Sequence, residues 1–222
     1  MLIPLDTSGG RSGFPAMTAL LVAVNLAIFL TASPVTVESW SFDLSLSRHF
    51  PTATWLTYAF LHGDWWHLLG NMWMLFVFGW AVESRWGAGQ FLIVYLLCAA
   101  GAAVTQAALM PEPGLMIGAS GAVSGILGAL TVLDHRQRVL SLLFLGLFGV
   151  LLEVRVLIYL GLWIALHMDA VQSLYSSEGV AENVAWFAHL GGCAVGMIVA
   201  LAVRVVQRRR RFSLTWPGEQ SR

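Results

Sequence analysis

The sequence places one serine where it could act as a nucleophile. Ser120 stands in the tetrapeptide Gly118-Ala119-Ser120-Gly121, at the start of an apolar run that carries no charge before Asp134. Flanking glycines allow another backbone to approach closely, which favours a reactive serine held between helices. Turns of the type Gly-x-Ser-Gly are also common in membrane proteins for structural reasons, so the tetrapeptide alone leaves both interpretations open.

Three more polar side chains, His67, Asn71 and His189, lie in apolar segments. Ionisable groups inside membrane spans favour a functional role. A histidine beside Ser120 could take the hydroxyl proton as the oxygen attacks a carbonyl, and then return it to the leaving amine. His67 and Asn71, on one helical face, could stabilise the oxyanion together with the Ser120 backbone N–H. Structural roles are the alternative, because each group could simply bond a neighbouring polar group.

No carboxylate is an obvious third member of a triad, because Asp64 and Asp169 lie on the correct side but in loops. Asp134 lies 14 residues after Ser120, roughly 20 Å along a helix, so the sequence predicts a Ser-His dyad. A metal site built from His62, His67 and His189 is one alternative, but no carboxylate or cysteine accompanies it on the matching face, and no metal or cofactor is predicted. A small transporter or channel that relays protons through histidines is another alternative.

The composition identifies a membrane protein. Of the 222 residues 58% are hydrophobic and 11% charged, whereas soluble domains carry about 25% charged residues. Basic and acidic residues balance at 12 each, so the charge indicates no nucleic-acid partner. Cys98 and Cys193 lie in apolar runs and are expected to be buried free thiols.

The apolar segments predict an all-α integral membrane fold with six spans. The spans are expected at 14–32, 66–82, 91–109, 117–133, 153–168 and 184–206. A signal peptide is the alternative for the first span, although its apolar core would be shorter.

The domain boundaries follow from these spans: a disordered cytoplasmic tail at 1–13, a membrane domain at 14–206 and a basic cytoplasmic tail at 207–222. Residues 33–66 are expected in the membrane interface, and 139–152 as an interfacial or re-entrant segment.

The arginines predict the orientation. Arg85, Arg136, Arg138 and the cluster 208–211 fall on one side of six spans, so both termini are expected in the cytoplasm. The second, fourth and sixth spans then begin at the outer face, which brings His67, Ser120 and His189 to similar depth. The small-residue pairs that should let the fourth and sixth spans approach are Gly121 with Gly125 and Gly192 with Gly196.

Together these residues resemble the rhomboid family of intramembrane serine proteases. The resemblance covers roughly residues 45–205. It rests on the segments 67–71, 118–121 and 188–192, and on Glu83, residues 86–87, Phe91 and Gly196. It implies a six-helix bundle with a membrane-embedded first loop, a cavity open outward, and a flexible cap at 169–183. The implied roles are Ser120 as nucleophile, His189 as general base, His67 and Asn71 at the oxyanion, and Gly118 before the nucleophile.

Two positions depart from the family pattern. Many members have Trp-Arg where this chain has Trp55-Leu56, and some place a tyrosine where it has Ser124. The resemblance implies an endopeptidase that forms an acyl-enzyme and cleaves transmembrane segments of other proteins near their outer ends. Its partners would be those substrates and the lipid bilayer, in a bacterial plasma (inner) membrane. The alternative is an inactive rhomboid-like protein that binds membrane helices. The sequence predicts neither the oligomeric state nor the substrate.

Overall fold

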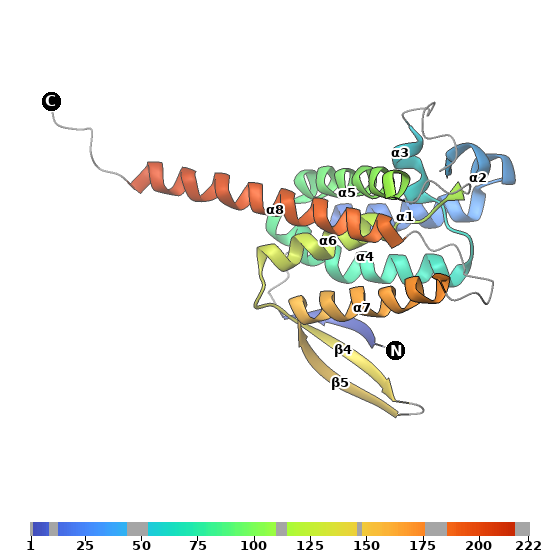
Figure 1. Ribbon diagram of the computed structural model, residues 1–222. Coiled ribbons are helices and arrows are strands. Elements are labelled where there is room, and N and C mark those ends of the chain that lie inside the picture. Colours follow the sequence, from blue (N-terminus) through green and yellow to red (C-terminus); the bar gives the residue numbers. More distant parts are fainter. Residues whose placement is uncertain are drawn as a thin grey trace.

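Helices make up most of the computed structural model, which describes residues 2–8, 13–43, 53–109, 115–145, 148–175 and 186–215. They are α1 Ala16–Thr31, α2 Pro34–Trp40, α3 Thr54–Thr57, the 3₁₀ turn η1 Tyr58–Phe60, α4 Trp65–Trp86, α5 Ala88–Leu109, α6 Ser120–Leu133, α7 Val156–Tyr175 and α8 Trp186–Thr215. The longer helices form a bundle, and the end of α8 extends beyond it (Figure 1). The predicted helical class is therefore confirmed for the described residues.

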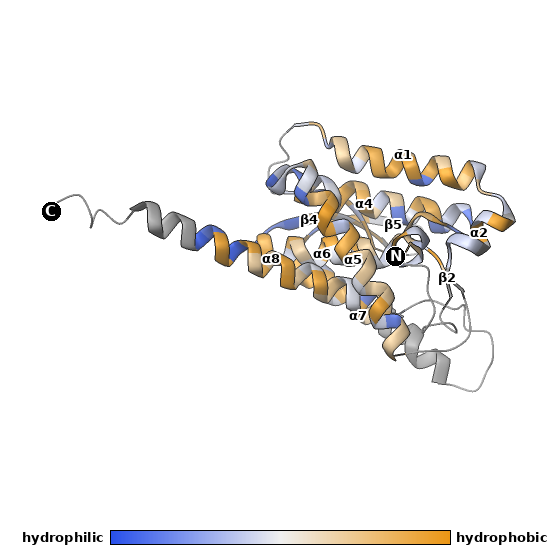
Figure 2. Cartoon of the chain, turned by 90° about the horizontal axis from the view of Figure 1, so that it is seen from above, coloured by the Kyte–Doolittle hydropathy of each residue, from blue (hydrophilic) through white to orange (hydrophobic). Residues whose placement is uncertain are grey.

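Two of the described helices are long and apolar enough to cross a bilayer, α5 and the Trp186–Arg208 part of α8. Shorter apolar helices are α1, α6 and the Val156–Ala165 part of α7. Hydrophobic residues dominate α1, α5 and the first part of α8 (Figure 2), as expected for helices that face lipid. The outward-facing side chains include Leu20, Ile93 and Ile198, each more than half exposed.

A three-stranded antiparallel sheet lies beside the helices, which corrects the all-α prediction. Its strands are β1 Leu2–Thr7, β4 Arg138–Leu145 and β5 Phe148–Arg155, in the order β1-β4-β5. The interfacial or re-entrant segment predicted at 139–152 is thus most of a β-hairpin, and residues 2–7 of the predicted disordered tail form a strand. The segments 2–7 and 139–152 are too short to cross a bilayer as helices. Pairing between strands satisfies their backbone N–H and C=O groups instead. A second, small sheet joins β2 Phe42–Asp43 to β3 Leu115–Met116.

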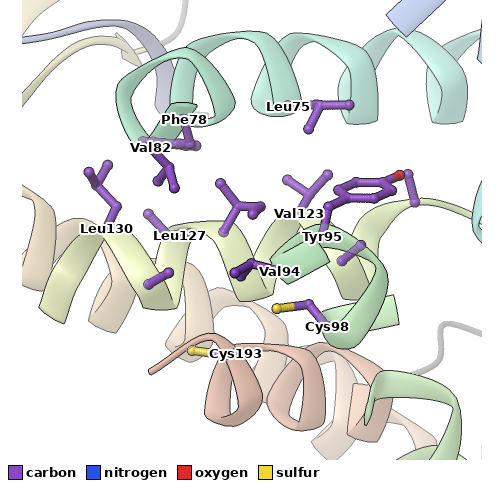
Figure 3. Close-up of a cluster of buried hydrophobic side chains, with 14 of the residues drawn as sticks. Leu75, Phe78, Val82, Val94, Tyr95, Cys98, Val123, Leu127, Leu130 and Cys193 are labelled. Carbon is purple, nitrogen blue, oxygen red and sulfur yellow. The ribbon is translucent and has the colours of Figure 1, made fainter. Parts of the chain in front are cut away.

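The core surrounds α6, whose residues from Gly121 to Thr131 are all buried. Helix α4 contributes Leu75, Phe78 and Val82, which lie on the side of α6 that carries Val123, Leu127 and Leu130 (Figure 3). On the other side α6 packs against α5 and α8. Cys98 and Cys193 lie in this region as buried free thiols, as the sequence predicted.

Backbone packs directly on backbone between α6 and α8. A Cβ atom built on Gly192 would overlap the carbonyl oxygen of Gly121, and one built on Gly196 would overlap that of Gly125. A side chain at either position would push the helices apart. These glycines therefore set the distance between α6 and α8.

One buried carboxylate fixes the start of α1. Glu83, only 6% exposed near the end of α4, accepts hydrogen bonds from the backbone N–H groups of Met17 at 2.9 Å and Thr18 at 2.8 Å. It also accepts the Thr18 hydroxyl at 2.6 Å. The first N–H groups of a helix lack intrahelical partners, so Glu83 acts as a cap supplied by another helix.

We expect Gly192→Ala to lower the free energy of unfolding by about 1–3 kcal/mol, because the methyl group has no room against Gly121. Gly161 in α7 is the matched control, since a Cβ there meets nothing within 4 Å. Thermal unfolding in detergent measures both variants. Equal melting temperatures for Gly192→Ala and Gly161→Ala would contradict the close packing.

We expect Glu83→Gln to cost about 1–3 kcal/mol, because the amide offers only one acceptor oxygen to three charge-assisted hydrogen bonds. The same substitution at Glu153 is the control. Its ion pair with Arg138 is 3.0 Å long but the Glu153 side chain is 55% exposed, so its loss should cost about 0–1 kcal/mol. The melting temperature should therefore fall clearly for Glu83→Gln and little for Glu153→Gln.

Candidate active site

The start of α6 carries Ser120 and is shaped by Gly118. Gly118 has φ +119°, which side-chain-bearing residues rarely adopt. Its N–H donates to the Tyr58 carbonyl at 3.0 Å, and this bond ties the turn to η1. Ser120 is the first residue of α6, so its N–H belongs to the helix-start groups without an intrahelical acceptor.

The structure brings Ser120 and His189 into contact. The Nε2 atom of His189 lies 2.7 Å from the Ser120 hydroxyl oxygen, a hydrogen-bond distance, although the two residues are 69 positions apart. His189 is 5% exposed, and Ser120 is half-buried. With the ring proton on Nδ1, Nε2 is the acceptor for the hydroxyl proton.

Neighbouring helices hold the first turn of α8 around His189. The Ser124 hydroxyl lies 2.7 Å from the Gly121 carbonyl oxygen and 2.8 Å from that of His189, so its proton bridges α6 and α8. The buried side-chain oxygen of Gln106, on α5, accepts the Ala188 N–H at 3.0 Å. These contacts fix the height and rotation of His189 relative to Ser120.

Two tryptophan rings pack edge-on against the imidazole. Trp163 of α7 and Trp186 of α8 have ring centroids 5.3 Å and 5.8 Å from that of His189. The two tryptophans supply the aromatic packing that a tyrosine at position 124 would provide, since Ser124 has no ring. Sequence reasoning missed both, although Trp186 lies three residues before His189 and therefore on the same helical face. No comparable local signal points to Trp163.

His67 and Asn71 lie on the first turns of α4, facing the same cavity. Asp64 caps this helix, because its carboxylate accepts the His67 N–H at 2.9 Å. The Asn71 amide donates to the His67 carbonyl at 3.0 Å, and Asn71 is 8% exposed. The His67 ring lies over Gly118, since a Cβ built there would be 2.7 Å from His67 Nε2. A side chain at residue 118 would therefore displace this imidazole.

His62, in the connection before α4, packs against the His67 ring with centroids 5.1 Å apart. Burial, with a smaller effect of His67, lowers the pKa of His62 to about 3. A neutral His62 adds no charge beside His67. Within the described ranges, no group of three His, Cys, Asp or Glu side chains is arranged to hold a metal ion.

A cavity of about 360 Å³ joins these groups. Its lining comes from four helices and one strand: Leu2 of β1; Trp66, His67, Gly70, Asn71 and Met74 of α4; Ser120 and Val123 of α6; Tyr159 and Trp163 of α7; and His189 of α8. The cavity thus contains all four predicted polar side chains. Sequence reasoning did not anticipate Leu2 and Tyr159, because their positions depend on how β1 and α7 pack.

Comparisons with known proteins agree with this arrangement. A family profile for the rhomboid domain matches residues 50–205. The chain is 30% identical to Rhomboid-like protein 11, chloroplastic, of Arabidopsis thaliana over 190 residues, which cover 81% of this chain and 62% of the relative. It is 30% identical to Rhomboid protease GluP of Bacillus subtilis (strain 168) over 203 residues, 87% of this chain and 36% of the relative.

A third relative is Rhomboid protein 1, mitochondrial, of Saccharomyces cerevisiae, 26% identical over 213 residues, 89% of this chain and 56% of the relative. The chain spans less than two thirds of the length of these three relatives. The family match covers most of the chain, including every residue that lines the cavity except Leu2. The chain therefore belongs to the rhomboid family and is an integral membrane protein.

Proposed function

We propose that this protein is an intramembrane serine endopeptidase that uses a Ser120-His189 dyad. The observation that carries the proposal is the 2.7 Å contact between His189 Nε2 and the Ser120 hydroxyl, at a cavity large enough for water and a peptide segment. The name of the Bacillus subtilis relative, a rhomboid protease, supports the same activity. The substrates are transmembrane segments of other proteins in the lipid bilayer.

The reaction begins as the Ser120 oxygen attacks the scissile carbonyl carbon and His189 Nε2 takes the hydroxyl proton. The tetrahedral intermediate collapses, the C–N bond breaks, and the imidazolium gives its proton to the leaving amine. Water then attacks the acyl-enzyme, passes a proton to His189, and releases the carboxylic acid as Ser120 recovers its proton. Trp163 and Trp186 hold the imidazole ring in place during these steps by packing against it.

The oxyanion would be stabilised from the α4 side and from the start of α6. The Asn71 amide nitrogen carries a second N–H besides the one given to His67, and the His67 ring adds a donor near Gly118. The Ser120 N–H belongs to a helix start, where partial positive charge favours an anion. Donors fixed before the reaction stabilise the developing charge more than mobile water does.

We further propose six spans, α1, α4, α5, α6, α7 and α8, with both termini in the cytoplasm of a bacterial cell. Support comes from arginines at the end of the bundle opposite Ser120. Arg85 lies 3.3 Å from the Asp134 carboxylate, and Arg204 donates to the Val132 carbonyl at 3.0 Å, both at the far end of α6. Arginines at one end favour a cytoplasmic location for that end. The cavity then opens toward the outer half of the membrane.

We expect a fluorophosphonate probe to label the purified protein at Ser120, and reconstituted protein to cleave members of a panel of single-span substrates. Ser120→Ala should abolish both, and His189→Ala should reduce labelling strongly. Ser124→Ala is the control, since it keeps the nucleophile and should still label, but more slowly. Labelling that survives Ser120→Ala would remove the nucleophile assignment. Absence of both labelling and cleavage would indicate an inactive, helix-binding rhomboid-like protein.

We expect Asn71→Ala to lower kcat about 10²–10³-fold with little change in KM, the effect typical of losing one oxyanion donor. The matched control is Asn25→Ala in α1, because Asn25 makes the same type of bond, to the Leu21 carbonyl at 2.8 Å, away from the cavity. Asn25→Ala should lower the melting temperature and leave kcat intact. Equal kcat losses in both variants would assign Asn71 a purely structural role.

A further inference from the structure

An apolar groove lies between α3 and α5, which pack against each other (Figure 1). Its volume is about 450 Å³, within the range of pockets that hold small ligands. The described residues that line it are apolar apart from one indole N–H: Trp55 and Leu56 of α3, and Ile93, Leu96, Leu97 and Ala100 of α5. None of them lines the cavity around Ser120, so the groove is a separate site.

One face of α5 forms the floor of the groove. Ile93, Leu97 and Ala100 follow one another at spacings of four and three residues, so they share this face. Ile93 and Leu97 are exposed, whereas Tyr95 and Cys98, which point into the bundle, are fully buried. The floor of the groove therefore faces away from the protein core, toward the lipid that surrounds a membrane protein.

The groove lies along the middle of α5. This helix has 22 residues and rises roughly 33 Å, close to the ~30 Å thickness of a bilayer core. Ile93 is five residues from the start of α5, and Ala100 is nine residues from its end. In a span of this length the stretch between them lies within the hydrocarbon layer. An occupant of the groove must therefore be apolar, because this layer holds no water.

Hydrogen bonds of Tyr58 keep the groove open. Tyr58 directly follows α3, and its buried hydroxyl donates to the Ala99 carbonyl of α5 at 2.8 Å. Its carbonyl accepts the Gly118 N–H at 3.0 Å. Trp55 and Leu56 cannot move onto α5 and close the groove without straining these bonds. An open apolar groove loses dispersion contacts unless another group fills it.

Leucine at position 56 suits an apolar occupant. Many members of the family have arginine at this position, next to the tryptophan. A guanidinium in the groove would bring a charge into the hydrocarbon layer, which is costly, and would attract a phosphate instead of a hydrocarbon chain. Leu56 leaves the groove without a charged side chain among its described lining residues.

We propose that this groove binds one acyl chain of a membrane phospholipid between α3 and α5. The apolar lining, the position in the hydrocarbon layer and the fixed walls together identify the occupant, since acyl chains fill this layer of a bilayer. The inference does not depend on the proposed function. A lipid tail is as apolar outside the groove as inside it, so retention depends on how well the chain packs. A side chain that fills the groove should therefore release the lipid.

Native mass spectrometry tests the proposal on protein extracted with detergent from vesicles of phosphatidylglycerol and phosphatidylethanolamine. We expect the unmodified chain to retain a single phospholipid. Ala100→Phe places a ring in the groove and should lower the retained fraction at least about fivefold, because the chain loses its packing contacts. Ala108→Phe is the matched control, since Ala108 is exposed on α5 outside the groove and its substitution should leave retention unchanged.

A second pair of variants acts from α3. Leu56→Arg should also release the lipid, because it brings a charge into the groove, whereas Leu56→Met should retain it. Phosphatidylcholine with a diazirine in its acyl chain, added to the vesicles, should crosslink on irradiation to Trp55 and Leu97. No retained lipid in the unmodified chain, or equal retention in Ala100→Phe and Ala108→Phe, would overturn the proposal. Crosslinks at these residues from a diazirine-bearing single-span substrate, and none from the lipid, would also overturn it.

Discussion

The direct backbone contact between α6 and α8 is the constraint on which the rest of the structure depends. Lipid supplies little hydrophobic force between helices, so their association relies on close packing and interhelical hydrogen bonds. Gly192 and Gly196 bring α8 onto the carbonyls of Gly121 and Gly125. At that separation the Ser124 hydroxyl reaches the His189 carbonyl, and His189 Nε2 reaches the Ser120 hydroxyl. A wider spacing would break both contacts together.

Polar side chains then fix where the other helices begin, from buried positions at Glu83 and Gln106 and from an exposed one at Asp64. Glu83 binds the first N–H groups of α1, Gln106 binds the Ala188 N–H of α8, and Asp64 caps α4. A helix start exposes N–H groups that lipid cannot satisfy, so a protein partner must do so. The contacts at the starts of α4 and α8 also determine the height of the polar side chains that line the cavity. Stability and the geometry of the site therefore share one set of hydrogen bonds.

The bundle is not equally tight on all sides. Among the described residues, helices α5, α6 and α8 pack extensively on one another, whereas α7 makes few contacts with α8 or with the β4–β5 hairpin. The cavity lies toward this looser side, where Tyr159 and Met74 meet and where Leu2 lines its wall. Ser120 and His189 lie on the tightly packed helices α6 and α8, whereas Tyr159 and Leu2 line the looser wall. In this fold the sheet supplies part of that wall.

The sequence by itself determined the helical membrane class, the approximate positions of the longer helices and the four polar side chains around the cavity. It could do so because apolar length fixes spans, and because polar residues in such spans are few. The strands β1, β4 and β5 were not predictable, since short apolar runs fit a strand, an interfacial helix or a re-entrant segment equally well. Only the tertiary structure decided how Trp163, Tyr159 and Leu2 meet the site, because these contacts join segments far apart in sequence through packing that no local pattern encodes.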